Sequence, residues 1–185
     1  MNILALSGSL RAHSYNTKLI EIARDVSDHD TTITVWPLHD LPLFNEDLES
    51  GEGPESVRRF KAAILGADAL LIATPEYNSS IPGVLKNALD WASRRESGTR
   101  PLSNIPVAVM GATTGTLGTA LAQKHLRQIL SHVGAQVLTT PSVYVMNAGN
   151  VLQSESEHYP AVVERIGRLV QALVHWTNRL EGTRT

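Results

Sequence analysis

The chain has 185 residues, of which 42% are hydrophobic and 18% charged, which suits a single packed domain over residues 1–185 and excludes a disordered chain. The formal net charge of −2 gives no electrostatic basis for nucleic-acid binding. The absence of cysteine excludes disulfides, thiolate metal sites and thiol redox chemistry, so any redox role requires a bound cofactor.

Short apolar runs alternate with longer helical patterns along the chain. Apolar or β-branched runs bounded by Gly, Pro or Ser predict strands, and apolar residues at helical spacing predict helices. The first part of the chain is predicted to form, in order, a strand at 2–6, a helix at 16–26, a strand at 31–36, a long loop at 38–53, a helix from Pro54 to Gly66 and a strand at 68–74. The rest is predicted to form a helix from Pro82, a strand at 105–110, a helix at 117–133, a strand at 136–139 and a final helix with an apolar stripe from 162 to 174.

Regular alternation of strands and helices predicts a parallel sheet with helices on both faces. Five strands favour the doubly wound, flavodoxin-like α/β arrangement with strand order 2-1-3-4-5. Ligands of such sheets bind beyond the carboxyl ends of the strands. The loops after the first, third and fourth strands are therefore the candidate site.

The loop after the first strand reads SGSLRAHSYN, residues 7–16. Its hydroxyls, Arg11, backbone amides and the following helix start together suit a phosphate group. Neither G-x-G-x-x-G nor G-x-x-x-x-G-K-[ST] is present, which favours a terminal monophosphate over a dinucleotide pyrophosphate or a triphosphate. Alternatively, Ser14 or Asn16 simply caps the first helix.

The loop after the third strand begins with Pro75, Glu76, Tyr77 and Asn78. It offers backbone amides, a flat aromatic ring and a side-chain amide, which suit a planar heteroaromatic ligand. A tight turn that merely joins strand to helix is the alternative. After the fourth strand, GATTGTLG at 111–118 supplies glycines whose amides can approach a ligand closely, unless Thr116 only caps the next helix.

Two of these segments resemble a known family. G-S-L-R-x-x-S-x-N at 8–16 and P-E-Y-N-x-S-x-P-G-x-L-K-N-A-x-D-W at 75–91 are similar to motifs of the NAD(P)H-dependent FMN reductases, which include quinone, azo-dye and chromate reductases. The resemblance implies that the first loop holds the FMN phosphate, the second lines the isoalloxazine ring and the third lies at its pyrimidine side through Thr113 or Thr114. The expected cofactor-binding residues are Ser9, Arg11, Ser14, Tyr15, Asn16, Pro75, Glu76, Tyr77, Asn78, Ala112, Thr113, Thr114 and Gly115.

The implied activity is hydride transfer from NAD(P)H through flavin N5 to a small acceptor such as a quinone, an azo compound or a metal oxyanion. Because the flavin carries the chemistry, no catalytic side chain is expected. A flavodoxin-type one-electron carrier and a non-catalytic flavin-binding protein remain alternatives. A net charge of −2 argues against the carrier, since such carriers are usually strongly acidic.

The resemblance also implies a homodimer or homotetramer with sites at the subunit boundary. Leu43 and Phe44 are expected to be exposed there, and Arg94 and Arg95 are expected near the mouth of the site. The seven histidines form neither H-x-x-x-H nor H-E-x-x-H, so no metal site is expected. The amino-terminal segment lacks a basic leader, and no apolar run approaches membrane length, so we expect a cytoplasmic protein with no membrane partner.

Overall fold

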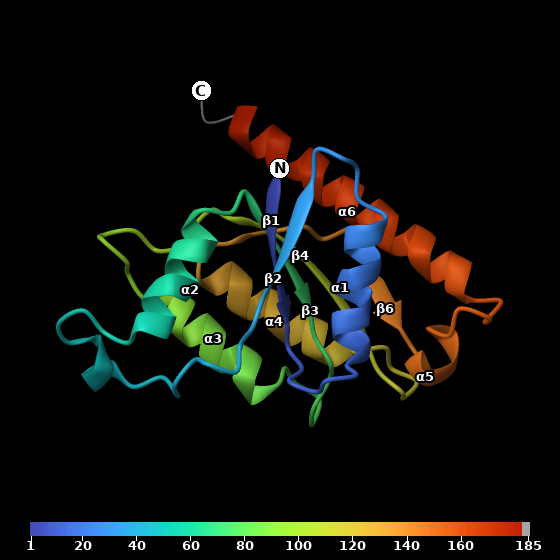
Figure 1. The fold of residues 1–185 in the computed structure, drawn as a ribbon, viewed down its shortest axis with the longest axis horizontal. Helices are drawn as coiled ribbons and strands as arrows, with labels where there is room; N and C mark the ends of the chain where they lie inside the picture. The colour runs from blue at the N-terminus through green and yellow to red at the C-terminus, as the bar shows by residue number, and fades with distance from the viewer. Residues whose placement is uncertain (183–185) are drawn as a thin grey trace.

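The computed structural model of the protein describes residues 1–182, and the last three residues of the predicted domain, 183–185, lie outside the described residues. One parallel sheet runs through the centre of the molecule with strand order β2-β1-β3-β4-β5 (Figure 1). The predicted fold class and strand order are confirmed. The strands are β1 (Asn2–Ser7), β2 (Thr32–Trp36), β3 (Ala69–Ala73), β4 (Pro106–Ala112), β5 (Gln136–Val137) and β6 (Val143–Val145).

The predicted count of five strands is wrong, because two short strands share the edge of β4. The first residues of β4 pair with β5, where Val107 lies opposite Val137. The last residues of β4 pair with β6, where Met110 lies opposite Val143. The predicted strand at 136–139 therefore ends early. Pro141, which has no backbone N–H to donate to a sheet, lies in the connection between the two strands.

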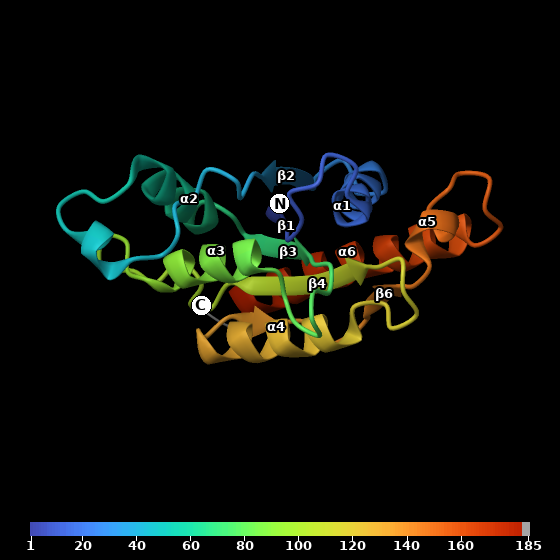
Figure 2. The same cartoon turned by 90° about the horizontal axis from the view of Figure 1, so that it is seen from below.

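Helices cover both faces of the sheet, as predicted. Figure 2 shows α1 and α6 on one side and α2 and α3 on the other, and α4 joins the second group through its core contacts. The helices are α1 (Tyr15–Asp25), α2 (Glu55–Leu65), α3 (Gly83–Ser93), α4 (Ala120–His132), α5 (Ala148–Val151) and α6 (Tyr159–Gly182), with a short 3₁₀ helix, η1 (Glu46–Glu49).

Alternation along the strands divides the apolar core into two layers. In β1, Leu4 and Leu6 point into the layer under α2, α3 and α4, whereas Ile3 and Ala5 point into the layer under α1 and α6. All four side chains are buried. The continuous apolar run from Ile3 to Leu6 is what a sheet covered on both faces requires.

Helix ends follow the sequence where a proline or glycine marks them. Pro54 and Gly66 flank α2, as predicted. The predicted helix at 117–133 instead begins at Ala120, because Gly118 (φ 57°) and Thr119 (φ 67°) lie in the left-handed region and cannot continue a helix. Thr116 is therefore not its cap.

The long loop at 38–53 lies against α3. The Asn87 side chain donates to Pro42 O (2.9 Å) and accepts from Phe44 N (2.7 Å), and the Trp91 indole N–H also donates to Pro42 O (2.8 Å). Phe44 packs edge-on against Trp91, so the expectation that Phe44 is exposed is wrong, whereas Leu43 is 83% exposed.

Arg94 and Arg95 do not lie near the mouth of the site. They follow the last residue of α3, and this helix runs back from the carboxyl ends of the strands toward their amino ends, as the helix of a βαβ unit must (Figure 1). Arg94 instead binds Glu49 of η1 at 2.7 Å and lies over the Phe44 ring.

Candidate functional site

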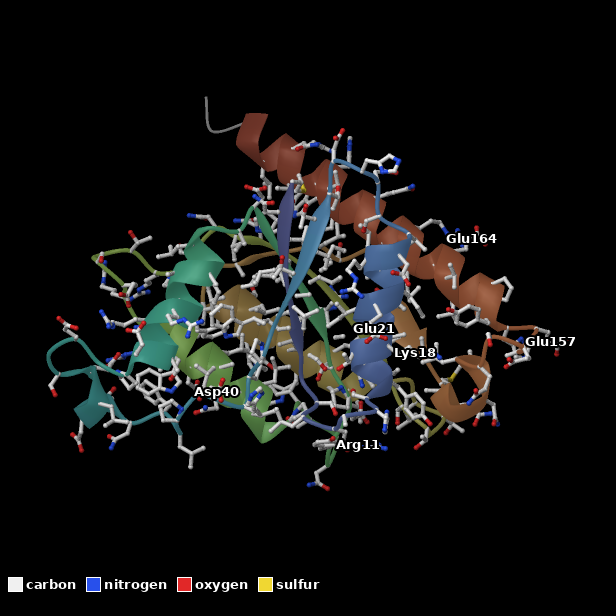
Figure 3. The ribbon with its side chains drawn as sticks, in the orientation of Figure 1. Arg11, Lys18, Glu21, Asp40, Glu157 and Glu164 are labelled. Atoms are coloured by element: carbon white, nitrogen blue, oxygen red, sulfur yellow. The ribbon has the colours of Figure 1, made fainter. Side chains whose placement is uncertain are left out.

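A pocket of about 170 Å³ lies at the carboxyl ends of β1, β3 and β4, where the three candidate loops meet. Figure 3 shows Arg11 at this end of the sheet. Every lining residue belongs to the predicted cofactor-binding set, and Asn78 and Gly115 are the two members of that set that do not line it. The lining residues are Ser9, Arg11, Ser14, Tyr15, Asn16, Pro75, Glu76, Tyr77, Ala112, Thr113 and Thr114.

A larger cavity, of about 590 Å³, lies between α3 and α4 and contains none of the predicted site residues. It lies along the helices rather than at the strand ends. We place the site in the smaller pocket, because ligands of doubly wound sheets bind where the strands end and the loops change direction.

The first loop presents hydroxyl groups at the start of α1. The Ser14 hydroxyl accepts hydrogen bonds from the backbone N–H groups of Asn16 (3.2 Å) and Thr17 (3.4 Å), so Ser14 is the cap of this helix. A hydroxyl that accepts from the backbone still has its own hydrogen to donate. Capping and phosphate binding are therefore compatible at Ser14.

Arg11 is the positive charge of the pocket. Its side chain is exposed, and within residues 1–182 the guanidinium has neither an ion-pair nor a hydrogen-bond partner. The Ser9 hydroxyl beside it accepts weakly from the Arg11 backbone N–H (3.4 Å). An unpaired guanidinium, two hydroxyls and a helix N-terminus form a donor set that fits a phosphate.

Asn16 holds the first loop to the end of β4. Its side chain donates to Ala112 O (3.0 Å) and accepts from Ala112 N (2.9 Å), and the side chain is buried. The amide thus pairs with the backbone as a neighbouring strand would. These contacts give Asn16 a structural role, and phosphate binding by this residue stays a prediction.

The second loop forms a two-residue turn. Tyr77 N donates to Ser80 O (2.9 Å) and Ser80 N donates to Tyr77 O (3.0 Å). Asn78 (φ 51°) and Ser79 (φ 61°) both lie in the left-handed region, as a type I′ turn requires, and Asn is a favoured residue there. Because Asn78 forms the exposed tip of the turn, its side chain lies outside the pocket.

Both ends of this turn contact α4. The Glu76 carboxylate accepts from the backbone N–H of Ala122 in the first turn of α4 (2.9 Å). The Ser80 hydroxyl forms a 2.7 Å hydrogen bond with Nδ1 of His125. Sequence reasoning missed these two contacts, since they join residues 46 and 45 positions apart that no local pattern connects.

Near its end, β4 lies close to the segment after β3 and to the start of α4 at Gly111. A Cβ at this position would overlap the Thr119 hydroxyl and the backbone oxygen of Thr74, so only glycine fits. Beyond it, the Thr113 hydroxyl accepts from Gly115 N (3.2 Å) and is half-buried, whereas Thr114 is exposed. Both threonines line the pocket, so the structure does not favour one over the other as a ligand.

Two further findings concern other classes of site. Among residues 1–182 there is no group of three or more His, Cys, Asp or Glu side chains that could hold a metal ion. Within the same part of the chain, no helix has the length and apolar character needed to cross a membrane.

Comparison with known proteins agrees with this geometry. The model of the NADPH-dependent FMN reductase family matches residues 1–150. An NAD(P)H-dependent FMN reductase of Pseudomonas aeruginosa is 41% identical over 183 residues and covers 98% of each chain. A 2-hydroxy-1,4-benzoquinone reductase of a Burkholderia species is 37% identical over 86% of this chain and 90% of its own.

A solved structure is also similar. The flavoenzyme NAD(P)H:(acceptor) oxidoreductase FerB from Paracoccus denitrificans superposes with a TM-score of 0.85 at 35% identity, covering 96% of this chain and 97% of its own. The predicted resemblance and enzyme class, an FMN-dependent NAD(P)H oxidoreductase, are confirmed. The chain therefore belongs to the NADPH-dependent FMN reductase family.

Proposed function

We propose that the pocket at the carboxyl edge of the sheet is the FMN site of this enzyme and that residues 1–185 form a single FMN-binding domain. The observation that carries the proposal is the convergence of the three predicted loops on one pocket that contains an unpaired guanidinium. Ser9, Arg11 and Ser14 would bind the phosphate. The loops at 75–78 and 112–115 would hold the isoalloxazine ring, with Tyr15 contacting the cofactor beside them.

The chain's own part in the reaction is binding and orientation. The chemistry that bound FMN would supply is the transfer of hydride from NAD(P)H to a second substrate. The one carboxylate of the pocket, Glu76, uses one of its oxygens to accept from Ala122 N–H. The Tyr77 hydroxyl lies on a half-exposed ring at the turn. We therefore assign no proton-transferring side chain.

The rim of the site favours an apolar acceptor. Four large apolar side chains from the loops at this edge, Leu10, Tyr77, Leu117 and Met146, are between 48% and 62% exposed. Such a rim suits a small planar molecule. Relatives that are named for a quinone substrate support a quinone as the electron acceptor. Nicotinamide and acceptor would use the same open side in turn, which predicts ping-pong kinetics with NAD(P)H and benzoquinone.

We further propose a cytoplasmic homodimer or homotetramer. Leu43, which is exposed although Asn87 and Trp91 hold the loop on either side of it, is a candidate contact between subunits. Sedimentation that gives a 20.1 kDa species with flavin bound and activity intact would contradict this proposal.

A spectrum and an anaerobic titration test the function. The purified protein should show the visible absorption of FMN, lose it on addition of NADH or NADPH, and regain it on addition of benzoquinone. The two titrations also give the nicotinamide preference. Bound flavin that NAD(P)H fails to reduce would favour a one-electron carrier or a non-catalytic flavin-binding protein instead.

A further inference from the structure

The turn at 77–80 contacts the rest of the molecule through α4 on both sides. Glu76, just before the turn, binds Ala122 N–H, and Ser80, at its end, binds His125. Ala122 and His125 are three residues apart, which places them on one side of the helix. The segment that would hold the flavin ring is therefore positioned by α4, the helix that follows the third loop of the site.

The turn needs such support. Asn78 and Ser79 both have positive φ values, and a non-glycine residue in that region costs free energy that surrounding contacts must offset. Apart from Tyr77–Ser80 pairing, the turn is exposed on its outer side. Without the contacts to α4, a two-residue turn of this kind would sample other conformations.

The helix needs the contact as well. The cap residue of α4, Thr119, has a left-handed backbone and makes no side-chain capping bond, and its hydroxyl accepts from the side chain of Gln123 (3.0 Å). Glu76 supplies the missing acceptor from a distant part of the chain, and its negative charge faces the positive end of the helix dipole.

We propose that Glu76 and His125 are positioning residues that fix the 77–80 turn against α4 and thereby set the affinity for the flavin ring. The proposal rests on the proposed FMN site and adds to it a residue, His125, that lies outside the pocket. Neither side chain takes part in proton transfer. Their positioning effect reaches the flavin through the turn.

Glu76 also has an electrostatic effect that can be separated from its positioning effect. Its carboxylate lines the pocket, and a reduced flavin carries additional negative charge, so the carboxylate disfavours reduction. The start of α4 compensates part of that charge. Glu76→Gln keeps an oxygen that can accept from Ala122 N–H but removes the charge, whereas Glu76→Ala removes both.

The experiment measures binding of FMN and riboflavin to flavin-free protein by fluorescence titration, and the reduction potential of the reconstituted enzyme. Glu76→Ala and His125→Leu should each weaken both flavins by at least about fivefold, equivalent to about 1 kcal/mol. Because the turn would hold the ring, the preference for FMN over riboflavin should not change. Glu76→Gln should bind within about twofold of the wild type and show a more positive potential.

Matched variants exclude a general loss of stability. His125→Asn keeps a polar atom where Nδ1 lies and should bind flavin more tightly than His125→Leu, close to the wild type. Lys124 is an exposed neighbour on α4, and Lys124→Ala should bind as the wild type does. Wild-type affinity in folded His125→Leu and Ser80→Ala would overturn the positioning role, even if Glu76→Ala does not fold. A wild type that binds neither flavin would instead refute the proposed FMN site.

Discussion

The two loops assigned to the flavin are built in opposite ways. In the loop at 8–16, Ser14 caps the helix α1 that follows. The charged group of this loop, Arg11, has no side-chain partner within the described residues. The turn at 77–80 is held by Glu76 and by His125, and its charge is already compensated by a helix. The first loop therefore leaves its charge free for a ligand, whereas the second uses its polar groups to keep its own shape.

The difference separates two kinds of mutational effect. Removing the free charge of the first loop should cost affinity for the phosphate and leave the fold intact. Removing a contact that joins the loops should cost free energy of unfolding or affinity for the ring. Comparing FMN with riboflavin, which lacks the phosphate, measures the two contributions separately.

The largest effect is expected at Gly111, where β4 lies close to the segment after β3 and to the start of α4. In Gly111→Ala the added methyl group would overlap Thr119 and the Thr74 backbone, so the free energy of unfolding should fall by about 3 kcal/mol. Gly83→Ala, where nothing lies within 4 Å of the added group, is the control and should not destabilise. Denaturant unfolding of the two variants measures the difference, and equal stabilities would show that position 111 tolerates a side chain.

Asn16→Ala should have the next largest effect. It leaves the N–H and C=O of Ala112 without their side-chain partner in a buried position, which should lower the free energy of unfolding by about 2 kcal/mol. Chemical denaturation in the absence of flavin measures this directly. If stability is unchanged and FMN binding alone is lost, Asn16 acts on the phosphate rather than on the fold.

Arg11→Ala should weaken FMN by at least about tenfold, equivalent to about 1.4 kcal/mol, because charge-assisted hydrogen bonds to phosphate are the strong ones. Riboflavin affinity and the free energy of unfolding should stay unchanged. Fluorescence titration with both flavins gives the ratio. A parallel loss for FMN and riboflavin would place Arg11 at the ring instead.

A smaller effect is expected for an ion pair outside both loops. Arg94 donates hydrogen bonds to Glu49, which holds the pKa of Glu49 below its ordinary value of 4.5. A lowered pKa in the folded state means that the pair stabilises the protein at neutral pH and that this contribution disappears as the pH falls through the folded-state value. Glu49→Gln should therefore lower the thermal midpoint slightly at pH 7, and by less in acid. A difference that grows in acid would contradict this assignment.

The smallest effect is expected for Tyr77→Phe. The substitution keeps the flat ring and removes a hydroxyl to which we assign no role in proton transfer. Flavin content and the rate of anaerobic flavin reduction should stay close to wild type. A loss of about a thousandfold in that rate with FMN still bound, equivalent to about 4 kcal/mol of barrier, would identify a proton donor.

The contrast between the loops also explains what the sequence could predict. The capping bonds of Ser14 lie within three residues, so this part of the first loop could be recognised from the pattern alone, whereas the bonds of Asn16 to Ala112 could not. Both motifs carried the family resemblance, and the three loops do meet in one pocket. That these residues bind FMN stays a prediction.

The parts that the sequence did not reveal depend on distant contacts or on very short elements. Nothing near Glu76 indicates that it caps a helix 46 residues later. The edge strands β5 and β6 have two and three residues, too few for a periodic pattern, and their positions depend on the length of β4. The start of α4 was misplaced because the left-handed conformation of Thr119 has no sequence signature comparable to a glycine or proline.

The contact of Trp91 with the long loop has a spectroscopic consequence. Its indole N–H is bonded to Pro42 O, and the ring is buried against Phe44. If the loop moves away from α3, the indole loses this bond and gains water, and its emission shifts to longer wavelength. With Trp36 and Trp176 replaced by Phe, Trp91 becomes the sole fluorophore of its kind in the chain. Its emission would then report whether this loop stays in contact with α3, without an attached label.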